Sequence, residues 1–242
     1  MDKAADAVVL SRFRNAGQTC ICTNRVYVQK SIAGAFAEKV ASRVSALKVG
    51  NGLETGIQVG PLIDEHGFRK VEEHVRDAVA RGGTVLAGGK PFSTPANGHA
   101  NGHANGNGNG HLHGWFFEPT VIGNARPEML VMHEETFGPV TSVYVVDGLD
   151  AALQAANDSR YGLTSAIFTA NLGHAMRFAR EIRAGMVHVN GATVQAEPHV
   201  PFGGVGESGY GREMGFFAMH EYTEAHSVWV NVDAKIPPFY PR

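Results

Sequence analysis

Short apolar runs typical of β-strands alternate along this chain with longer amphipathic segments typical of α-helices. A helix that connects two strands of one sheet leaves them parallel, so the alternation predicts an α/β fold with a doubly wound, mostly parallel sheet. The last β-like run has no helix after it and is expected on a sheet edge or on another subunit. The expected strands are 25–29, 84–87, 121–122, 142–146, 165–169, 186–189 and 225–232, and the expected helices are 3–16, 31–47, 65–81, 149–157, 172–184 and 212–219.

In two of these helices the sequence also indicates where the helix begins or ends, or which face is buried. Ser31 stands where a residue could cap the helix over 31–47. Gly82 follows the helix over 65–81 and is expected to end it. The expected buried face of that second helix consists of Phe68, Val71, Val75 and Val79.

Residues 93–113, STPANGHANGHANGNGNGHLH, interrupt the pattern with asparagine, glycine and histidine. Almost nothing in this segment could be buried, which predicts a surface insertion. The expected organisation is therefore one domain over 1–222 that contains this insertion, followed by a terminal strand and tail over 223–242.

Composition excludes several classes of protein. The chain has 242 residues, 43% of them hydrophobic, which is enough for a large core. Its formal net charge of −2 and the lack of a basic cluster argue against nucleic-acid binding. No apolar run is long enough for a membrane span, and the N-terminus does not look like a signal peptide. Only two cysteines are present, so a reducing, cytoplasmic location is expected.

One of those cysteines has the setting of a nucleophile. Cys20 lies in the string FRNAGQTCICTNR, between the first expected helix and the first expected strand. A thiolate is the reactive form of cysteine, and backbone dipoles at such a junction favour it. This position predicts a reactive thiol rather than a packing residue.

The same string resembles the nucleophile segment of the aldehyde dehydrogenase superfamily, which has a phenylalanine, a Gly-Gln pair, the cysteine and an arginine at these places. In that family the cysteine thiolate adds to an aldehyde carbonyl and forms a thiohemiacetal. A hydride then leaves to NAD(P)⁺, and water cleaves the resulting thioester to give the acid. The resemblance thus implies an oxidoreductase with Cys20 as catalytic residue and an aldehyde as substrate.

A second segment, Glu134 to Pro139, is similar to the family's EExFGP motif. By this resemblance Glu135 binds the nicotinamide ribose hydroxyls and Phe137 packs near the nicotinamide of NAD or NADP. Lys70 falls where the family often has a lysine near the adenosine ribose. The neighbouring family glutamine is replaced here by Gly67.

Two substrate classes remain open. Arg14 occupies the place where succinate-semialdehyde dehydrogenases have an arginine that pairs with the far carboxylate of the substrate, a task suited to its forked guanidinium. The C-terminal half, with Asn190 and the string PFGGVGESGYGR, is instead more similar to benzaldehyde- and vanillin-type dehydrogenases. By this resemblance Asn190 and Phe202 are expected to bind the substrate, with Phe202 in the aldehyde channel. An acid semialdehyde is favoured because Arg14 has a defined chemical role, the binding of a substrate carboxylate, whereas the glycine-rich string has none.

The second cysteine and the twelve histidines invite further hypotheses. Cys22 lies two residues after Cys20, close enough for a strained and easily reduced disulfide that could switch the nucleophile off. The histidines of the 93–113 insertion lack partner acids or cysteines, and a closed zinc site needs four ligands. No physiological metal is expected.

Members of this family are about twice as long as this chain. By the resemblance, the part without a counterpart carries the NAD(P) domain, an oxyanion-holding asparagine and a water-activating glutamate. The chain is thus expected to be a fragment or truncated product, inactive alone, that forms homo-oligomers through its terminal strand. The alternatives are a non-catalytic assembly module and a cofactor-free cysteine esterase.

Overall fold

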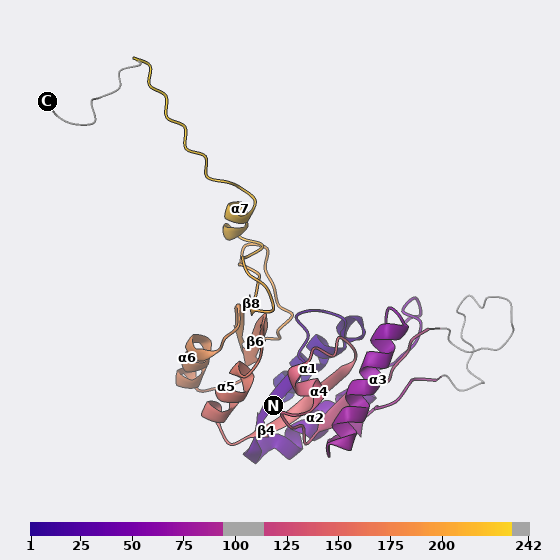
Figure 1. Cartoon of the computed structure of the whole chain (residues 1–242). Helices are drawn as coiled ribbons and strands as arrows, with labels where there is room; N and C mark the ends of the chain where they lie inside the picture. The colour runs from indigo at the N-terminus through magenta and orange to yellow at the C-terminus, as the bar shows by residue number, and fades with distance from the viewer. Residues whose placement is uncertain (94–113, 234–242) are drawn as a thin grey trace, which may run out of the picture.

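The fold is built around a four-stranded, mostly parallel sheet with the strand order β1-β4-β3-β2. The computed structural model describes residues 1–93 and 114–233, so most of the 93–113 insertion and residues 234–242 lie outside the described residues (Figure 1). Strands β1 (Arg25–Gln29), β4 (Val140–Val146) and β3 (Thr120–Gly123) run parallel, and β2 (Thr84–Ala87) is an antiparallel edge. The predicted α/β class and mostly parallel sheet are confirmed.

The remaining strands form two separate pairs. Strands β6 (Thr164–Ile167) and β7 (Met186–Val189) are parallel. The two-residue strands β5 (Tyr161–Gly162) and β8 (Val205–Gly206) are antiparallel and were not predicted, because two residues show no periodicity. The strands expected in one sheet are therefore divided among three. Among the described strands, β1 pairs only with β4 and β6 pairs only with β7, so each leaves one edge open.

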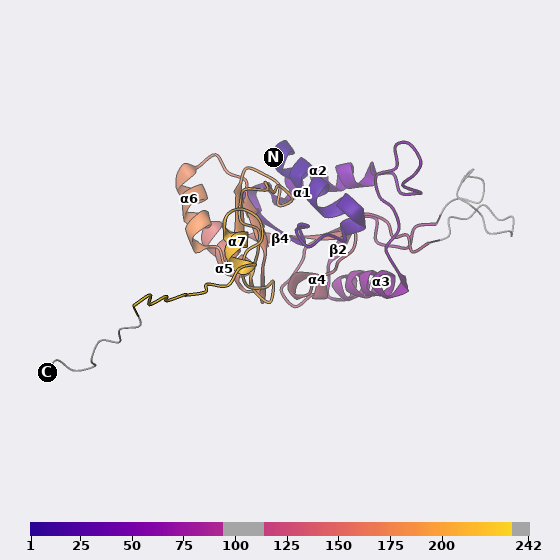
Figure 2. The same cartoon turned by 90° about the horizontal axis from the view of Figure 1, so that it is seen from above.

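Helices cover both faces of the main sheet. In Figure 2, α1 and α2 lie on one side of β4 and β2, and α3 and α4 lie on the other. Helices α5 and α6 lie beside β6 (Figure 1), and α6 contacts β7. The helices are α1 (Asp2–Phe13), α2 (Ala33–Ser45), α3 (Glu65–Ala80), α4 (Leu130–His133), α5 (Leu149–Asn157), α6 (Leu172–Glu181) and α7 (Phe217–Glu221), with short 3₁₀ turns at Arg14–Gly17 and Lys30–Ile32.

Several expected boundaries were wrong. The first helix ends at Phe13 rather than at residue 16, because Asn15 and Ala16 take left-handed backbone angles. Ser31 is not a helix cap, since it lies inside a 3₁₀ turn and α2 begins at Ala33. Val79 is 48% exposed, and its expected place on the buried face of α3 is taken by His74.

The C-terminal region differs most from expectation. The helix expected over 212–219 is found at Phe217–Glu221. The run over 225–232, expected as a strand, does not form one in the structure and extends away from the body of the molecule (Figure 1). Its apolar side chains are strongly exposed: Val228, Trp229, Val230 and Val232.

Local chemistry explains why α3 begins and ends where it does. The Asp64 carboxylate accepts the backbone N–H of Gly67 at 2.8 Å, which caps the first turn. Gly82 has φ +89°, and the N–H of Gly83 reaches back to the Ala78 carbonyl at 2.8 Å. This is a Schellman end, which glycine favours because it has no Cβ. The predicted stop at Gly82 is confirmed.

The core lies between the main sheet and its helices. All four residues of β3 and the first four of β4 are buried, so both faces of the sheet are covered at these strands. Fully buried side chains of these strands pack against fully buried side chains of α2 and α3. These include Val40, Val44, Val71, Val121, Ile122 and Val140.

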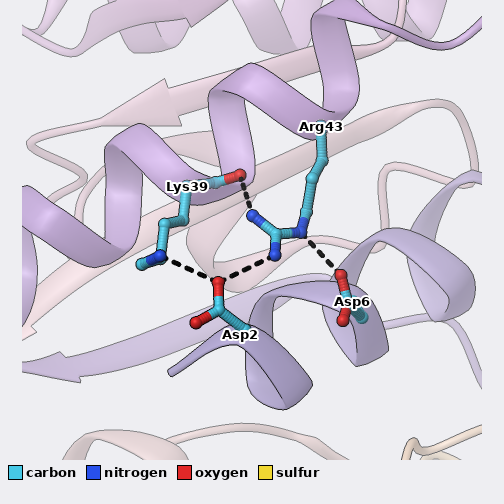
Figure 3. Close-up of polar contacts among 4 residues, drawn as sticks. All are labelled: Asp2, Asp6, Lys39 and Arg43. Atoms are coloured by element: carbon cyan, nitrogen blue, oxygen red, sulfur yellow. Dashed lines mark hydrogen bonds and ion pairs between the residues drawn. The ribbon is translucent and has the colours of Figure 1, made fainter.

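An ion-pair network joins α1 to α2 at the N-terminus (Figure 3). Asp2 accepts from Lys39 Nζ at 2.8 Å and from Arg43 Nη2 at 2.9 Å, and Asp6 accepts from Arg43 Nε at 2.6 Å. Hydrogen bonds from Lys39 and then Arg43 lower the pKa of Asp2 to about 2. Exposed pairs of this kind add little stability, but they orient the first turn of α1.

Candidate active site

The nucleophile loop reverses direction through an unusual backbone. Asn15, Ala16 and Gly17 have φ values of 52°, 53° and 75°. Left-handed angles are costly for a residue with a Cβ, and such strain collects at functional sites. The loop ends in a turn in which the Cys22 N–H donates to the Thr19 carbonyl at 3.0 Å, and Cys20 stands exposed in that turn.

Two glycines bring this loop against the segment from Glu134 to Pro139. A Cβ built on Gly17 would lie 2.1 Å from the carbonyl oxygen of Gly138. No larger residue fits that contact, and φ +75° disfavours any L side chain as well. Gly17 and Gly138 are 121 positions apart in the printed sequence, and their close approach brings the two motifs into contact.

A buried arginine ties the same two segments together. Arg12 is 1% exposed, and its Nη1 donates to Asn24 Oδ1 at 2.6 Å while its Nη2 donates to the Gly138 carbonyl. Burial lowers the pKa of Arg12 to about 10, so the guanidinium stays charged at neutral pH. This cation lies near Cys22 and Glu135.

Three hydroxyl groups hydrogen-bond to one another and to the backbone next to Cys20. Ser11 Oγ lies 2.6 Å from Thr193 Oγ1, and Thr23 Oγ1 donates to Ser11 Oγ at 2.9 Å. Thr193 Oγ1 also donates to the Ile21 carbonyl at 2.7 Å. The turn that carries Cys20 is thus anchored to the chain segment after Asn190.

His74 supports the Glu134–Pro139 segment from α3. Its Nδ1 lies 3.1 Å from Thr136 Oγ1, and its Nε2 lies 3.7 Å from Glu134 Oε2. Burial, and then the charge of Lys70, lower the pKa of His74, although Glu134, Glu73 and Asp77 oppose this. The ring is therefore held neutral at pH 7.

This lowered pKa predicts a loss of stability in mild acid. The unfolded chain protonates His74 near 6.5, whereas the folded chain takes up that proton only at a lower pH. The contribution of His74 to the free energy of unfolding should be fully present above pH 6.5 and should be lost as the pH falls through the folded pKa. His74→Asn should flatten that fall in urea titrations at pH 5 to 7. The pKa of His188 is also lowered by burial and leaves a residual slope. An unchanged slope in His74→Asn would contradict this reading.

A cavity of about 1310 Å³ opens beside the nucleophile turn. Four of the site residues predicted from sequence line it together, namely Cys20, Cys22, Glu135 and Asn190. The arrangement places a thiol and a carboxylate in one concave space large enough for a small organic substrate. Burial raises the pKa of the Cys22 thiol, which leaves the exposed Cys20 as the more accessible sulfur.

The other four predicted residues do not line this cavity. Arg14 is exposed, and its guanidinium has no hydrogen-bond or ion-pair partner among the described residues. Phe137 is 37% exposed with φ +50°, directly before Gly138. Lys70 is half-buried on α3 near His74, and Phe202 is half-buried with its N–H donating to the Glu213 carbonyl at 2.8 Å.

The Asn190 amide already has partners. Its Oδ1 accepts the Thr169 N–H at 2.9 Å, and its Nδ2 donates to the Thr169 carbonyl at 3.0 Å. Asn190 therefore joins β7 to the segment after β6 in this structure. A direct contact with substrate requires that this pair open.

Three supporting groups were not identified from sequence: Arg12, His74 and the Ser11–Thr23–Thr193 cluster. For Arg12 a signal existed, because Ala5, Val8 and Arg12 follow helical spacing and share the buried face of α1. The hydroxyl cluster offered none, since Thr193 meets Ser11 only through the tertiary fold.

Comparison with known proteins decides the family. The model of the aldehyde dehydrogenase family matches residues 1–228. The chain belongs to the aldehyde dehydrogenase family. It is 42% identical to the 3-sulfolactaldehyde dehydrogenase of Pseudomonas putida over 224 residues, which are 93% of this chain and 42% of that protein. It is 41% identical to succinate-semialdehyde dehydrogenase [NADP(+)] 1 of Schizosaccharomyces pombe, covering 96% of this chain and 43% of that enzyme.

Solved structures of the family agree with the fold. A putative aldehyde dehydrogenase from Burkholderia cenocepacia superimposes on 100% of this chain and 46% of its own, with a TM-score of 0.87 and 39% identity. The betaine aldehyde dehydrogenase of Staphylococcus aureus, solved with NAD⁺, covers 91% of this chain and 41% of its own, with a TM-score of 0.80 and 35% identity. The relatives thus bind NAD⁺ or use NADP⁺, and this chain spans less than half of their length.

Two further features bear on possible ligands and surroundings. Within residues 1–93 and 114–233, no group of three or more histidine, cysteine or acidic side chains is placed to hold a metal ion. No helix among the described residues has the length and apolar character needed to cross a membrane.

Proposed function

We propose that this chain provides the nucleophile half of an NAD(P)-dependent enzyme that oxidises an aldehyde to a carboxylic acid. The observation that carries this proposal is the exposed Cys20. It lies in the turn that follows the left-handed residues Asn15 to Gly17, and it lines a cavity together with Glu135. In the proposed reaction the Cys20 thiolate bonds to the aldehyde carbon and forms a thiohemiacetal. Loss of a hydride from that carbon and of the hydroxyl proton leaves a thioester, which water cleaves to the acid and the free thiol.

The structure offers part of a dinucleotide site. Glu135 lines the cavity of Cys20, and Phe137 presents an exposed ring two residues further on. A carboxylate suits ribose hydroxyls and an aromatic ring suits a flat heterocycle, so both fit the nicotinamide half of the cofactor. The bound cofactor supplies the hydride acceptor, while Arg12 and His74 keep the Glu135–Phe137 segment in register with Cys20.

Reconstitution tests this function. We expect residues 1–242 alone to produce no NADH or NADPH from aldehydes, because they match less than half the length of relatives that bind NAD⁺ or use NADP⁺. Joining the chain to the N-terminal half of the P. putida relative should give a reconstituted enzyme with aldehyde-dependent NAD(P)H formation. NADH formation by the isolated 242-residue chain, or none by a folded reconstituted enzyme, would contradict the proposal.

We propose an acid semialdehyde, such as succinate semialdehyde, as the substrate. Support comes from the exposed guanidinium of Arg14, which has no partner among the described residues, and from several relatives, which include succinate- and glutarate-semialdehyde dehydrogenases. Benzaldehyde-type substrates are the alternative, since an aromatic aldehyde needs no cation. Among the residues that would act here, Arg14 alone discriminates the two classes by charge.

Arg14→Ala should therefore act on one substrate class only. In the reconstituted enzyme, kcat/KM for succinate semialdehyde should fall about 30- to 150-fold, because a charge-assisted pair contributes about 2–3 kcal/mol. The value for benzaldehyde should stay the same. Arg69→Ala is the matched control, because Arg69 is an exposed arginine of α3 that pairs only with Glu65 among the described residues. Equal losses on both aldehydes would refute the role of Arg14.

We also propose that Cys20 and Cys22 form a reversible disulfide that blocks the nucleophile. Both lie in the turn closed by the Cys22–Thr19 hydrogen bond. One equivalent of peroxide would remove a hydrogen from each thiol and leave two waters. The count of free thiols in the chain should fall from two to zero and return with dithiothreitol. A count that stays at two would contradict the proposal. The Cys22→Ala variant, which cannot form the disulfide, should retain activity under the same treatment.

The exposed C-terminal run supports a further role in assembly. The apolar side chains of Val228, Trp229, Val230 and Val232 are strongly exposed, and we propose that the run over 225–232 joins copies of the chain. Sedimentation of 1–242 against 1–224 would test this, since only the longer chain should associate. A pure assembly module would associate without the reconstituted activity, and a cofactor-free esterase would cleave nitrophenyl esters through Cys20 without NAD(P).

A further inference from the structure

Arg12 is buried more completely than its hydrogen bonds explain. It is among the largest fully buried side chains of the described residues. A guanidinium carries five N–H donors, yet among these residues Arg12 donates only to Asn24 Oδ1 and to the Gly138 carbonyl. Its Nε is buried and has no hydrogen-bond partner among them. Both acceptors are neutral, so neither compensates the buried positive charge.

A charge is a poor choice for a link that is only structural. Burying a cation is costly without a counter-charge, and replacing it by an apolar side chain of similar size is often neutral or stabilising. The Gly138 carbonyl also accepts the Val140 N–H at 2.8 Å, and Asn24 is only half-buried, within reach of water. Neither acceptor therefore needs Arg12 to be satisfied. The charge itself is expected to have a role.

Glu135 is the group on which this charge acts. Burial lowers the pKa of Arg12, and Cys22 and then Glu135 oppose that change. Burial raises the pKa of the Cys22 thiol, so this thiol is neutral at pH 7 and the Glu135 carboxylate is the anion that remains. Glu135 is half-buried and lines the cavity of Cys20. Its carboxylate has no hydrogen-bond or ion-pair partner in the described part of the chain.

Attraction without a direct contact suits a carboxylate that must bind a ligand. An ion pair would occupy the oxygens of Glu135, whereas a cation held further away orients the group and leaves both oxygens free. The attraction extends further in a buried, weakly polarisable surrounding than in water. The hydrogen bond from Arg12 to Gly138 fixes the cation against the same segment, three residues after Glu135.

We propose that Arg12 is a positioning residue, whose buried charge holds the Glu135 carboxylate toward the cavity with both oxygens free for the ribose hydroxyls of NAD(P). The inference rests on the proposed function, in which Glu135 binds that ribose. Arg12 itself does not contact the cofactor and acts through Glu135. The role goes beyond the hydrogen bonds that link the two segments, because it requires the charge.

Arg12→Met removes the charge and keeps a long side chain. In the reconstituted enzyme, the urea midpoint should not fall, because a buried charge is lost. The Kd of NAD(P)H, measured by fluorescence titration, should rise about 10-fold or more. The KM for NAD(P)⁺ should rise in proportion, while the KM for succinate semialdehyde should stay within about two-fold. Arg177→Met is the matched control, because Arg177 is an exposed arginine that pairs with Asp150 and Glu181.

Arg12→Lys separates the charge from the shape of the guanidinium. Burial disfavours a charged lysine, so this variant should lose its proton at a lower pH than the parent, in which the pKa of Arg12 is about 10. Its affinity for NAD(P)H should be close to that of the parent at pH 6.5 and should approach that of Arg12→Met as the pH rises. Titration of Cys22 or Glu135 affects the parent as well, so the ratio of the two Kd values isolates position 12.

Three outcomes would overturn the proposal. One is an unchanged Kd of NAD(P)H in Arg12→Met. Another is a weaker affinity that accompanies a lower urea midpoint, because Arg12 would then be structural only. The third is an Arg12→Lys variant as weak as Arg12→Met at every pH. A parent that binds NAD(P)H but oxidises no aldehyde would contradict only the reaction at Cys20, and a folded parent that binds no NAD(P)H would overturn both.

Discussion

Replacing Cys20 by serine in the reconstituted enzyme is expected to lower kcat for aldehyde oxidation by about 10⁴-fold or more. A serine hydroxyl at neutral pH is a far weaker nucleophile than a thiolate, and no histidine among the described residues is hydrogen-bonded to position 20 to activate it. The substitution changes one exposed atom, so the fold and the cofactor contacts of Glu135 should persist. Stopped-flow measurement of NAD(P)H formation reads the loss directly.

Cys22→Ala is the matched control for this experiment. Cys22 is buried and its thiol pKa is raised by burial, so it is not expected to form a reactive thiolate at neutral pH. Activity should remain within a few-fold of the parent, with a stability loss of about 1 kcal/mol from the lost packing. If Cys22→Ala abolishes oxidation while Cys20→Ser does not, the nucleophile has been assigned to the wrong sulfur.

Gly17→Ala is expected to destabilise the chain by about 3 kcal/mol or more. The added methyl would meet the Gly138 carbonyl at 2.1 Å, and φ +75° adds a backbone cost of its own. Relief would require the nucleophile loop to move away from the Glu134–Pro139 segment, which would also break the hydrogen bond from Arg12 to Gly138. Urea unfolding at pH 7 measures the loss.

Gly34→Ala is the control for that substitution. Gly34 lies in α2, and a Cβ there meets no atom within 4 Å. Alanine favours the helix, so stability should rise by up to about 1 kcal/mol. A Gly17→Ala chain as stable as the parent would show that the two motifs do not need the close approach seen here.

The sequence predicted the α/β class and most of the elements because periodicity is a local property. Helix α5 and strand β7 begin and end where their patterns do. Local patterns failed where backbone angles or tertiary contacts decide the outcome. Nothing in the composition of residues 14–17 predicts three left-handed residues in a row, and they end the first helix early.

The site was predictable only in part for the same reason. Motif spacing identified Cys20 and Glu135, and the fold places both at one cavity. The groups that hold them in register are long-range contacts. His74 was not among the residues predicted for the buried face of α3, yet it is buried against Thr136, 62 positions away. The division of the strands into a main sheet and two separate pairs was equally unpredictable, because strand pairing is a tertiary contact.

The most direct test of the proposed chemistry is to trap the covalent intermediate. The reconstituted enzyme is mixed with succinate semialdehyde and NAD(P)⁺, quenched in acid and digested with trypsin, which cuts after Arg14 and Arg25 and releases both cysteines on one peptide. We predict a succinyl thioester on that peptide, and fragment ions that place it on Cys20. Turnover with no acyl group on this peptide, or with the acyl group on Cys22, would contradict the account.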